Sequence, residues 1–251
     1  MTTTIATVGK GGTGKTTIAA LLINILSQKG VVLAIDADPS TNLNLALGLP
    51  LNGTVGQMRE EMATAVKSSQ FDTSIAKPDY VELKIMESLV ESDKMDLLAM
   101  GRPEGPGCYC AANNMLRVSI DRLGKNYDYV VIDCEAGMEH ISRQTTREID
   151  ILLTVSDPTI RGIIAASRMK ELIKEMRTHV GQIRLIVNRV DGELPPEIRE
   201  AIEEYGLDLI AAIPKDPFLA GLEIKGEPLT ALPTDSPLQA GVKEVAGKLG
   251  L

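Results

Sequence analysis

Seven short runs of aliphatic and β-branched residues recur along the chain, and segments of helix length separate them. The runs do not alternate apolar with polar positions, so both faces of each strand are expected to be buried, as in a parallel sheet. Strand and helix in regular repetition predict an α/β fold with a doubly wound, mostly parallel sheet flanked by helices. The expected strands are 3–8, 31–36, 95–100, 129–133, 151–156, 184–189 and 209–214.

The segments between the runs differ in regularity. The clearest helical pattern covers 16–30 and closes on a glycine, which predicts a glycine cap. Residues 50–93 are less regular, with a helical pattern at 54–69 and a loop expected at 71–80. A chain of 251 residues suits one large domain, so we interpret the irregular region as an insertion on the sheet.

The charge and the cysteine content of the chain limit its expected binding partners and its expected cellular compartment. The formal net charge is −8, so no electrostatic footprint for nucleic acid is expected, and attraction to an anionic membrane is disfavoured. No apolar run approaches the roughly 20 residues that span a bilayer, and no secretory leader pattern fits the start. Three cysteines cannot all pair, which is typical of a cytoplasmic protein whose thiols serve metal or redox chemistry.

The strongest motif is VGKGGTGKTT at 8–17. It contains the phosphate-loop spacing G-x-x-x-x-G-K-T as Gly9, Gly14, Lys15 and Thr16, directly after an expected strand and before an expected helix. Lys15 is expected to reach the β- and γ-phosphates, and the Thr16 hydroxyl to ligate Mg²⁺. The other loop residues expected to bind nucleotide are Gly11, Gly12, Thr13 and Thr17.

Carboxylates follow two other expected strands. Asp36 and Asp38 lie two residues apart in IDADP, where they either serve the phosphate site or cap the next helix. Asp133 ends the strand VVID at the Walker B position, where a carboxylate holds Mg²⁺ through water. Gly137 follows as a candidate hinge. Together with the loop, these residues predict Mg²⁺-dependent hydrolysis of ATP to ADP and phosphate.

Two of the three cysteines, Cys108 and Cys110, stand one residue apart in GPGCYCAANN. A disulfide between them would close a small, strained ring, burial as small apolar residues is a second possibility, and a soft metal ion is a third. Two thiolates do not complete a closed zinc site, and the only supplements are Cys134, His140 and His179. Cys134 is expected to pack as a small apolar residue, and His140 is either a ligand or a polar residue that opens a helix.

The loop KGGTGKT resembles the deviant Walker A loop of the class that contains MinD, the partition ATPases and the nitrogenase iron protein. The resemblance implies that Lys10 reaches the partner's nucleotide across a homodimer, that Asp38 orients the attacking water, and that Asp36 lies near the magnesium shell. It also implies that Asn188 and Pro214 line the adenine. Such a dimer could bring two C-x-C pairs together and supply four thiolates.

Four segments taken together resemble a narrower family. KGGTGKTT, DADPST, GCYCAANN and DCEAGMEH are similar to the CooC-type nickel-maturation ATPases of carbon monoxide dehydrogenase, including the AcsF proteins. The resemblance implies a homodimer that binds Ni²⁺, or Zn²⁺ in its place, on Cys108 and Cys110 of both chains. It also implies that ATP helps to load nickel into the apo-enzyme of carbon monoxide dehydrogenase or acetyl-CoA synthase.

Two alternatives share the fold. A MinD- or partition-type switch without metal carriage would need a basic DNA-facing surface or a lysine-rich amphipathic C-terminal helix, and the acidic chain offers neither. An iron–sulfur carrier ATPase would need well-separated single cysteines or a C-x-x-C near the C-terminus, in place of C-x-C. The sequence therefore favours the nickel carrier.

Overall fold

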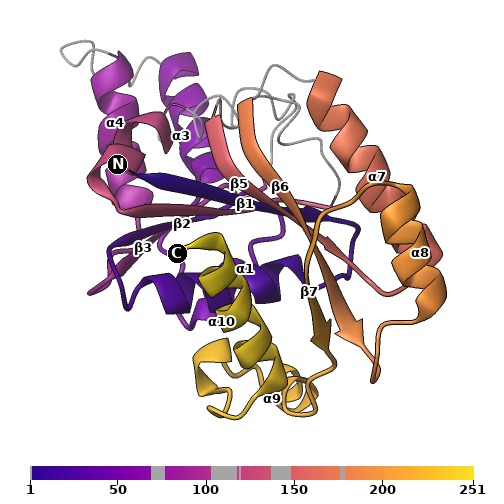
Figure 1. The fold of residues 1–251 in the computed structure, drawn as a ribbon. Helices are drawn as coiled ribbons and strands as arrows, with labels where there is room; N and C mark the ends of the chain where they lie inside the picture. Colours follow the sequence, from indigo (N-terminus) through magenta and orange to yellow (C-terminus); the bar gives the residue numbers. More distant parts are fainter. Residues whose placement is uncertain (1, 69–76, 103–117, 119, 137–147, 176–178) are drawn as a thin grey trace.

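The computed structural model describes residues 2–68, 77–102, 118, 120–136, 148–175 and 179–251 (Figure 1). Its centre is a seven-stranded sheet in the order β3-β2-β4-β1-β5-β6-β7, in which every neighbouring pair of strands is parallel. The fold class predicted from the sequence is confirmed. The strands are β1 (Thr3–Gly9), β2 (Val32–Asp36), β3 (Met95–Ala99), β4 (Tyr129–Asp133), β5 (Glu148–Ser156), β6 (His179–Val190) and β7 (Leu209–Pro214).

All seven predicted strands are present, and the largest differences are at the starts of β5 and β6. These strands begin at Glu148 and His179, several residues before their apolar runs, and the two residues pair in register. Backbone pairing needs no apolar side chain, so polar and exposed residues extend both strands beyond the predicted limits.

Helices cover both faces of the sheet (Figure 1). The apolar cluster on one face combines β-strand residues with residues of α1 (Lys15–Leu26), α2 (Leu43–Leu47), α9 (Leu219–Lys225), the 3-10 turn η2 (Leu229–Ala231) and α10 (Pro237–Leu249). The clusters on the other face include residues of α3 (Val55–Lys67), α4 (Lys77–Ser88), α7 (Ile160–Glu175) and α8 (Pro196–Glu204). A 3-10 turn, η1 (Gly124–Asn126), leads into β4.

The glycine cap predicted for the first helix is wrong. Helix α1 ends at Leu26, and the Gly30 amide donates to the Leu26 carbonyl at 3.0 Å across a following turn. A Cβ at Gly30 would lie 2.5 Å from a carboxylate oxygen of Asp128. Glycine is therefore required there because another side chain approaches closely, and not because it ends the helix.

The irregular region between β2 and β3 forms two helices. Helix α3 confirms the helical pattern at 54–69, whereas α4 begins at Lys77, inside the segment expected to be a loop. Val55 of α3 and Ile85 of α4 are buried in the same apolar cluster as residues of the sheet. These contacts are those expected of an insertion that packs on the sheet, and the single-domain organisation stays an interpretation.

The strand order brings the carboxyl ends of three strands together. Strand β1 lies between β4 and β5, and β2 lies on the far side of β4. In register, Thr7 of β1 pairs with Asp133 of β4, and Asp133 pairs with Asp36 of β2. Residues far apart in sequence thus meet where β1 enters the phosphate loop.

Candidate functional site

The phosphate loop connects β1 to α1 through glycines in left-handed conformations. Gly12 has φ +79° and Gly14 has φ +94°, values that residues with a side chain rarely adopt. Gly14 is the N-cap of α1, and no side chain caps this helix end. The amides of the first turn therefore remain for an anionic ligand, where the helix dipole adds a favourable field.

The predicted magnesium ligands lie in contact. Thr16 Oγ1 donates to Asp133 Oδ2 at 2.6 Å, and Thr7 Oγ1 donates to Asp133 Oδ1 at 3.1 Å. Asp133 is 1% exposed. A hydroxyl and a carboxylate at this separation are oxygen donors that fit Mg²⁺. Thr7 was missed from the sequence, although a polar residue inside an apolar strand was a signal for it.

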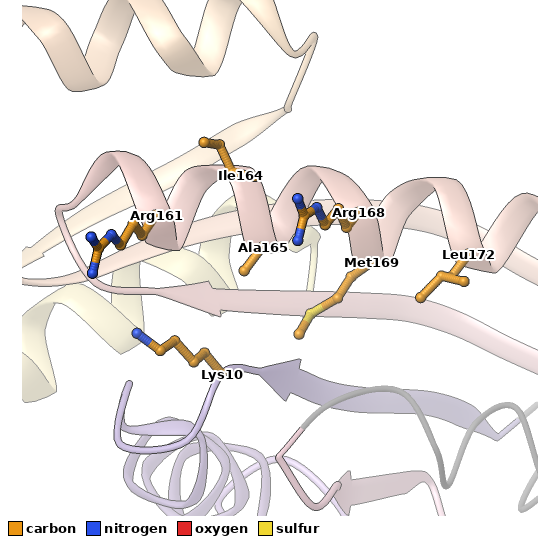
Figure 2. A pocket seen from close by; sticks show the side chains of 7 residues that line it. All are labelled: Lys10, Arg161, Ile164, Ala165, Arg168, Met169 and Leu172. Carbon is orange, nitrogen blue, oxygen red and sulfur yellow. The ribbon is translucent and has the colours of Figure 1, made fainter.

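The two loop lysines differ in exposure. Lys15 is buried, and its Nζ donates to the Lys10 carbonyl at 3.3 Å, so its ammonium group lies inside the curve of the loop. The Thr13 hydroxyl donates to the same carbonyl at 3.0 Å. The side chain of Lys10 is exposed and points away from the loop toward α7 (Figure 2). One lysine is thus directed inward and the other outward.

Asp36 holds the segment that follows β2. Its carboxylate accepts the Leu43 amide at 2.9 Å and the Asp38 amide at 3.1 Å. Leu43 is the first residue of α2, so Asp36 binds the N-terminus of that helix, which was one of the two roles open from the sequence. Asp38 lies beyond the end of β2 and accepts the Ser40 amide at 2.8 Å.

Burial shifts the titration of the two central carboxyls. Desolvation raises the pKa of Asp36 to about 7, and the neighbouring charge of Asp133 adds to the effect. Desolvation also raises the pKa of Asp133 to about 6, although the hydrogen bonds from Thr16 and Thr7 oppose the change. Without a bound cation, the site therefore disfavours two ionised carboxylates side by side.

Replacing Asp36 with asparagine is expected to stabilise the protein at pH 8 when nucleotide and Mg²⁺ are absent. The pKa of Asp36 is higher in the folded chain than in the unfolded chain, so the stability of the wild type falls as pH rises from about 4 to about 7. Asparagine does not ionise and can still accept the Leu43 amide. Urea unfolding in EDTA should show a gain of about 2–4 kcal/mol at pH 8 and none near pH 4.

The exposed Asp235 provides the control for this experiment. Asp235→Asn removes one negative charge without touching the site, and its stability should follow that of the wild type across the pH range. A lower stability of Asp36→Asn at pH 8 would contradict the expected effect of burial.

The predicted adenine-lining residues reach the same edge of the sheet. Asn188, in β6, is 4% exposed, and its Nδ2 donates to the Thr13 carbonyl at 2.9 Å. A Cβ at Gly14 would lie 2.5 Å from the same amide nitrogen. Pro214 ends β7 and pairs with Val190. In this structure Asn188 thus supports the phosphate loop, and its contact with a base stays a prediction.

The remaining predicted residues have different outcomes. Cys108, Cys110, Gly137 and His140 lie outside the described residues. Cys134 is buried in the apolar cluster, and burial raises the pKa of its thiol, which confirms that it packs as a small apolar residue. Among the described residues, no three His, Cys, Asp or Glu side chains are grouped so that they could hold a metal ion.

The strand direction separates His179 from the site. His179 begins β6, whereas the phosphate loop follows the end of the parallel strand β1. It therefore lies at the amino-terminal ends of the strands, opposite the phosphate loop.

The described helices include no segment with the length and the apolar character that a membrane span requires.

The geometry defines a nucleotide-binding phosphate loop with a Walker B carboxylate. A family model described as the CobQ/CobB/MinD/ParA nucleotide binding domain matches residues 4–229. An uncharacterized ATP-binding protein of Methanocaldococcus jannaschii is 43% identical over 246 residues, which cover 98% of this chain and 97% of that protein. The chain therefore belongs to the CobQ/CobB/MinD/ParA family and is an ATPase of the MinD/ParA class.

Two further comparisons bear on the function. The carbon monoxide dehydrogenase accessory protein CooC of Rhodospirillum rubrum is 32% identical over 227 residues, which cover 84% of this chain and 83% of that protein. The septum site-determining protein MinD of Pyrococcus horikoshii, solved with Mg-ADP, superposes with a TM-score of 0.71. That structure is 23% identical and covers 99% of this chain and 96% of its own, so it supports the fold.

Proposed function

We propose that this ATPase is a metallochaperone that carries nickel and assists its insertion into the metal cluster of carbon monoxide dehydrogenase or acetyl-CoA synthase. The observation that carries the proposal is the C-Y-C motif in a chain 32% identical to a carbon monoxide dehydrogenase accessory protein. Thiolates suit Ni²⁺ and also Zn²⁺, which could take its place. Cys108 and Cys110 of two chains would together supply four ligands, which one chain cannot do.

The site residues take the following roles in this proposal. Lys15, held inside the loop, contacts the β- and γ-phosphates of ATP, and the amides of the first turn of α1 bind phosphate oxygens. Asp38 orients the attacking water. The water oxygen bonds to the γ-phosphorus, the bond to the β,γ-bridging oxygen breaks, and ADP leaves with the electron pair while the proton of the water passes to phosphate.

Thr16 and Asp133 would hold Mg²⁺, Asp133 through water, because their oxygens lie 2.6 Å apart at the end of β4. The bound ion would neutralise charge on the β- and γ-phosphates. Asp36 would lie near its shell. Gly137 would act as the hinge that follows Asp133, and Asn188 and Pro214 would line the base.

Lys10 makes the nucleotide site depend on a second chain in this proposal. Its side chain is exposed, unlike that of Lys15, and is free to reach the nucleotide of a partner subunit. A cation there would stabilise charge on the transferred phosphoryl group, as an arginine finger does. ATP would then favour the homodimer, and the homodimer would complete the thiolate site, so the two equilibria would be linked.

A nucleotide switch without metal cargo is the second candidate. The likeness to a solved MinD supports it, because the whole fold and the phosphate loop are compatible with either role. The distinguishing property is metal binding.

The experiment that tests the proposal is equilibrium binding of Ni²⁺ with light scattering, with and without ATP. The wild type should bind one Ni²⁺ per two chains together with dimer formation, and Cys108→Ser should lose this binding. Cys134→Ala is the matched control, because it removes a buried thiol that packs in the core. Its Ni²⁺ stoichiometry should equal that of the wild type.

Unaltered Ni²⁺ binding in Cys108→Ser, or no binding by the wild type, would contradict the nickel proposal and leave the switch. Visible absorbance of the purified protein that is lost in Cys108→Ser would instead indicate an iron–sulfur carrier. Zn²⁺ measured in the same way separates preference for one ion from general thiolate affinity.

A further inference from the structure

One acidic side chain connects three segments just beyond the end of β7. Asp216 lies two residues after Pro214, which is one of the residues proposed to line the base. Its Oδ1 accepts the Phe218 amide at 2.8 Å, and its Oδ2 accepts the Leu238 amide at 3.2 Å and the Ser236 hydroxyl. The carboxylate therefore ties the segment after β7 to the starts of α9 and α10.

The contact between Asp216 and Ser236 is shielded from water. Ser236 is fully buried and is the N-cap of α10. Its hydroxyl oxygen accepts the Gln239 amide at 3.0 Å, while its single hydrogen is donated to Asp216. Without this acceptor the buried hydroxyl would lose its partner, which is unfavourable. The contact therefore favours one position of the segment after β7 relative to α10.

Helix α10 is in turn held against β7 and α1 (Figure 1). A Cβ at Gly241 would lie 3.1 Å from side-chain atoms of Ile213, so the helix approaches β7 closely. Val242 is buried in the same apolar cluster as residues of α1. Beyond the far ends of the two helices, Lys29 Nζ donates to the Leu251 carbonyl. Because α1 begins in the phosphate loop, α10 is fixed relative to that loop.

The other side of the proposed base site is also attached to the phosphate loop. Asn188 of β6 donates to the Thr13 carbonyl at 2.9 Å. Two residues further along, the Val190 carbonyl accepts the Lys215 amide at 2.9 Å, which holds the start of the segment after β7. One wall of the base site is thus positioned through Asn188, and the other through Asp216 and α10.

We propose that Asp216 is a positioning residue for the adenine base. This inference rests on the proposed function, in which Pro214 and Asn188 line that base. The phosphates bind where α1 begins, and the base lies against the segment that Asp216 ties to α10, so the carboxylate fixes the separation of the two ends of the site. A ligand that occupies both ends gains from this preorganisation, whereas a ligand of the phosphate loop alone does not.

The substitution Asp216→Asn disturbs this arrangement without a large change of volume. The carbonyl oxygen of asparagine can still accept the Phe218 amide. Its NH2 group then faces the Leu238 amide and the Ser236 hydroxyl, so that donors oppose each other where a carboxylate oxygen had accepted two hydrogen bonds. We therefore expect the segment after β7 to move relative to α10, while the phosphate loop keeps its contacts.

The test compares Mg-ADP with Mg-pyrophosphate by titration calorimetry on the full chain without Ni²⁺. Neither ligand carries a γ-phosphate, so the result depends on neither the ATP-driven dimer nor the metal cargo. The variants are Asp216→Asn and the milder Ser236→Ala. Asp235→Asn is the control for charge, because Asp235 is exposed and precedes the same helix. Val242→Ala is the control for lost stability, because it removes buried methyl groups from α10.

We expect the wild type to bind ADP at least about tenfold more tightly than pyrophosphate. Asp216→Asn should weaken ADP binding about tenfold and pyrophosphate binding less than about twofold, and Ser236→Ala should weaken ADP binding about threefold. Both controls should keep the wild-type ratio of the two affinities, Val242→Ala at a lower melting temperature. In turnover, Asp216→Asn should raise KM for ATP about tenfold and leave kcat within about threefold.

Three results would overturn the proposal. An equal loss of ADP and pyrophosphate affinity in Asp216→Asn would assign the residue a general structural role. An unchanged ratio in Asp216→Asn would remove its positioning role while Pro214 and Asn188 kept theirs, and Ser236→Ala decides in the same way if Asp216→Asn does not fold. The absence of any preference for ADP in the wild type would remove the base site itself. Failure of Ni²⁺ binding alters none of these measurements, so it would contradict the nickel proposal alone.

Discussion

Replacing Lys15 with alanine is expected to lower kcat/KM for ATP hydrolysis at least about 100-fold. The Lys15 ammonium group is buried in the curve of the loop, and the proposed contacts with the β- and γ-phosphates are charge-assisted. Such hydrogen bonds contribute about 1.5–3 kcal/mol each, so the loss of two corresponds to a factor of about 100 or more. Phosphate release measures turnover, and a fluorescent ATP analogue measures binding.

The matched control is Lys243→Ala, because Lys243 is exposed on α10 and distant in sequence from the loop. Its turnover should equal that of the wild type. The Lys15 variant should also unfold at a temperature close to that of the wild type, which separates loss of the ligand contact from loss of the fold. Turnover within threefold of the wild type would contradict the role of Lys15.

Replacing Gly9 with alanine is expected to destabilise the protein by about 3 kcal/mol or more. Gly9 ends β1 beside Val155 of β5, and a Cβ there would collide with the Val155 carbonyl oxygen. Both groups are backbone in the centre of the sheet, so relief requires two strands to move apart. For a domain of this size, differential scanning calorimetry should show a melting temperature lower by about 6–12 °C.

Gly12→Ala separates the collision from backbone strain. Gly12 also has positive φ, but a Cβ there would meet nothing within 4 Å. We expect this variant to cost about 1–2 kcal/mol, the usual penalty for a side chain in the left-handed region. Equal melting temperatures of the two variants would show that β1 and β5 can move apart at little cost in stability, which would contradict the prediction for Gly9→Ala.

Much of the fold could be predicted because buried parallel strands carry uninterrupted apolar runs, as VVID and LIVN do. The phosphate loop could be predicted because its glycine spacing depends on local backbone conformation. The early starts of β5 at Glu148 and of β6 at His179 could not be predicted. These residues pair through backbone groups, and their side chains do not show the apolar pattern of a buried strand. The start of α4 at Lys77 could not be predicted either, because the residues there have mixed preferences for helix and loop.

Contacts between distant segments were the least predictable part of the site. The contact between Asp36 and the Leu43 amide depends on how the chain turns after β2. The contact between Asn188 and Thr13 joins residues 175 positions apart. The position of α7 beside Lys10 was also missed, because the spacing of Arg161 and Arg168 indicates one face of a helix but not where the sheet places that helix.

The position of β1 in the sheet has a consequence for biosynthesis. The two neighbours of β1 follow it by more than a hundred residues, since Thr3 pairs with Tyr129 and Ile5 with Ile151. At about 5–20 residues per second, a ribosome needs roughly 6–24 s to make the chain between β1 and β4, the first of these neighbours to be synthesised. During that time the apolar strand β1 has neither β4 nor β5 to pair with. The nascent protein therefore has a defined period in which chaperones can bind this strand.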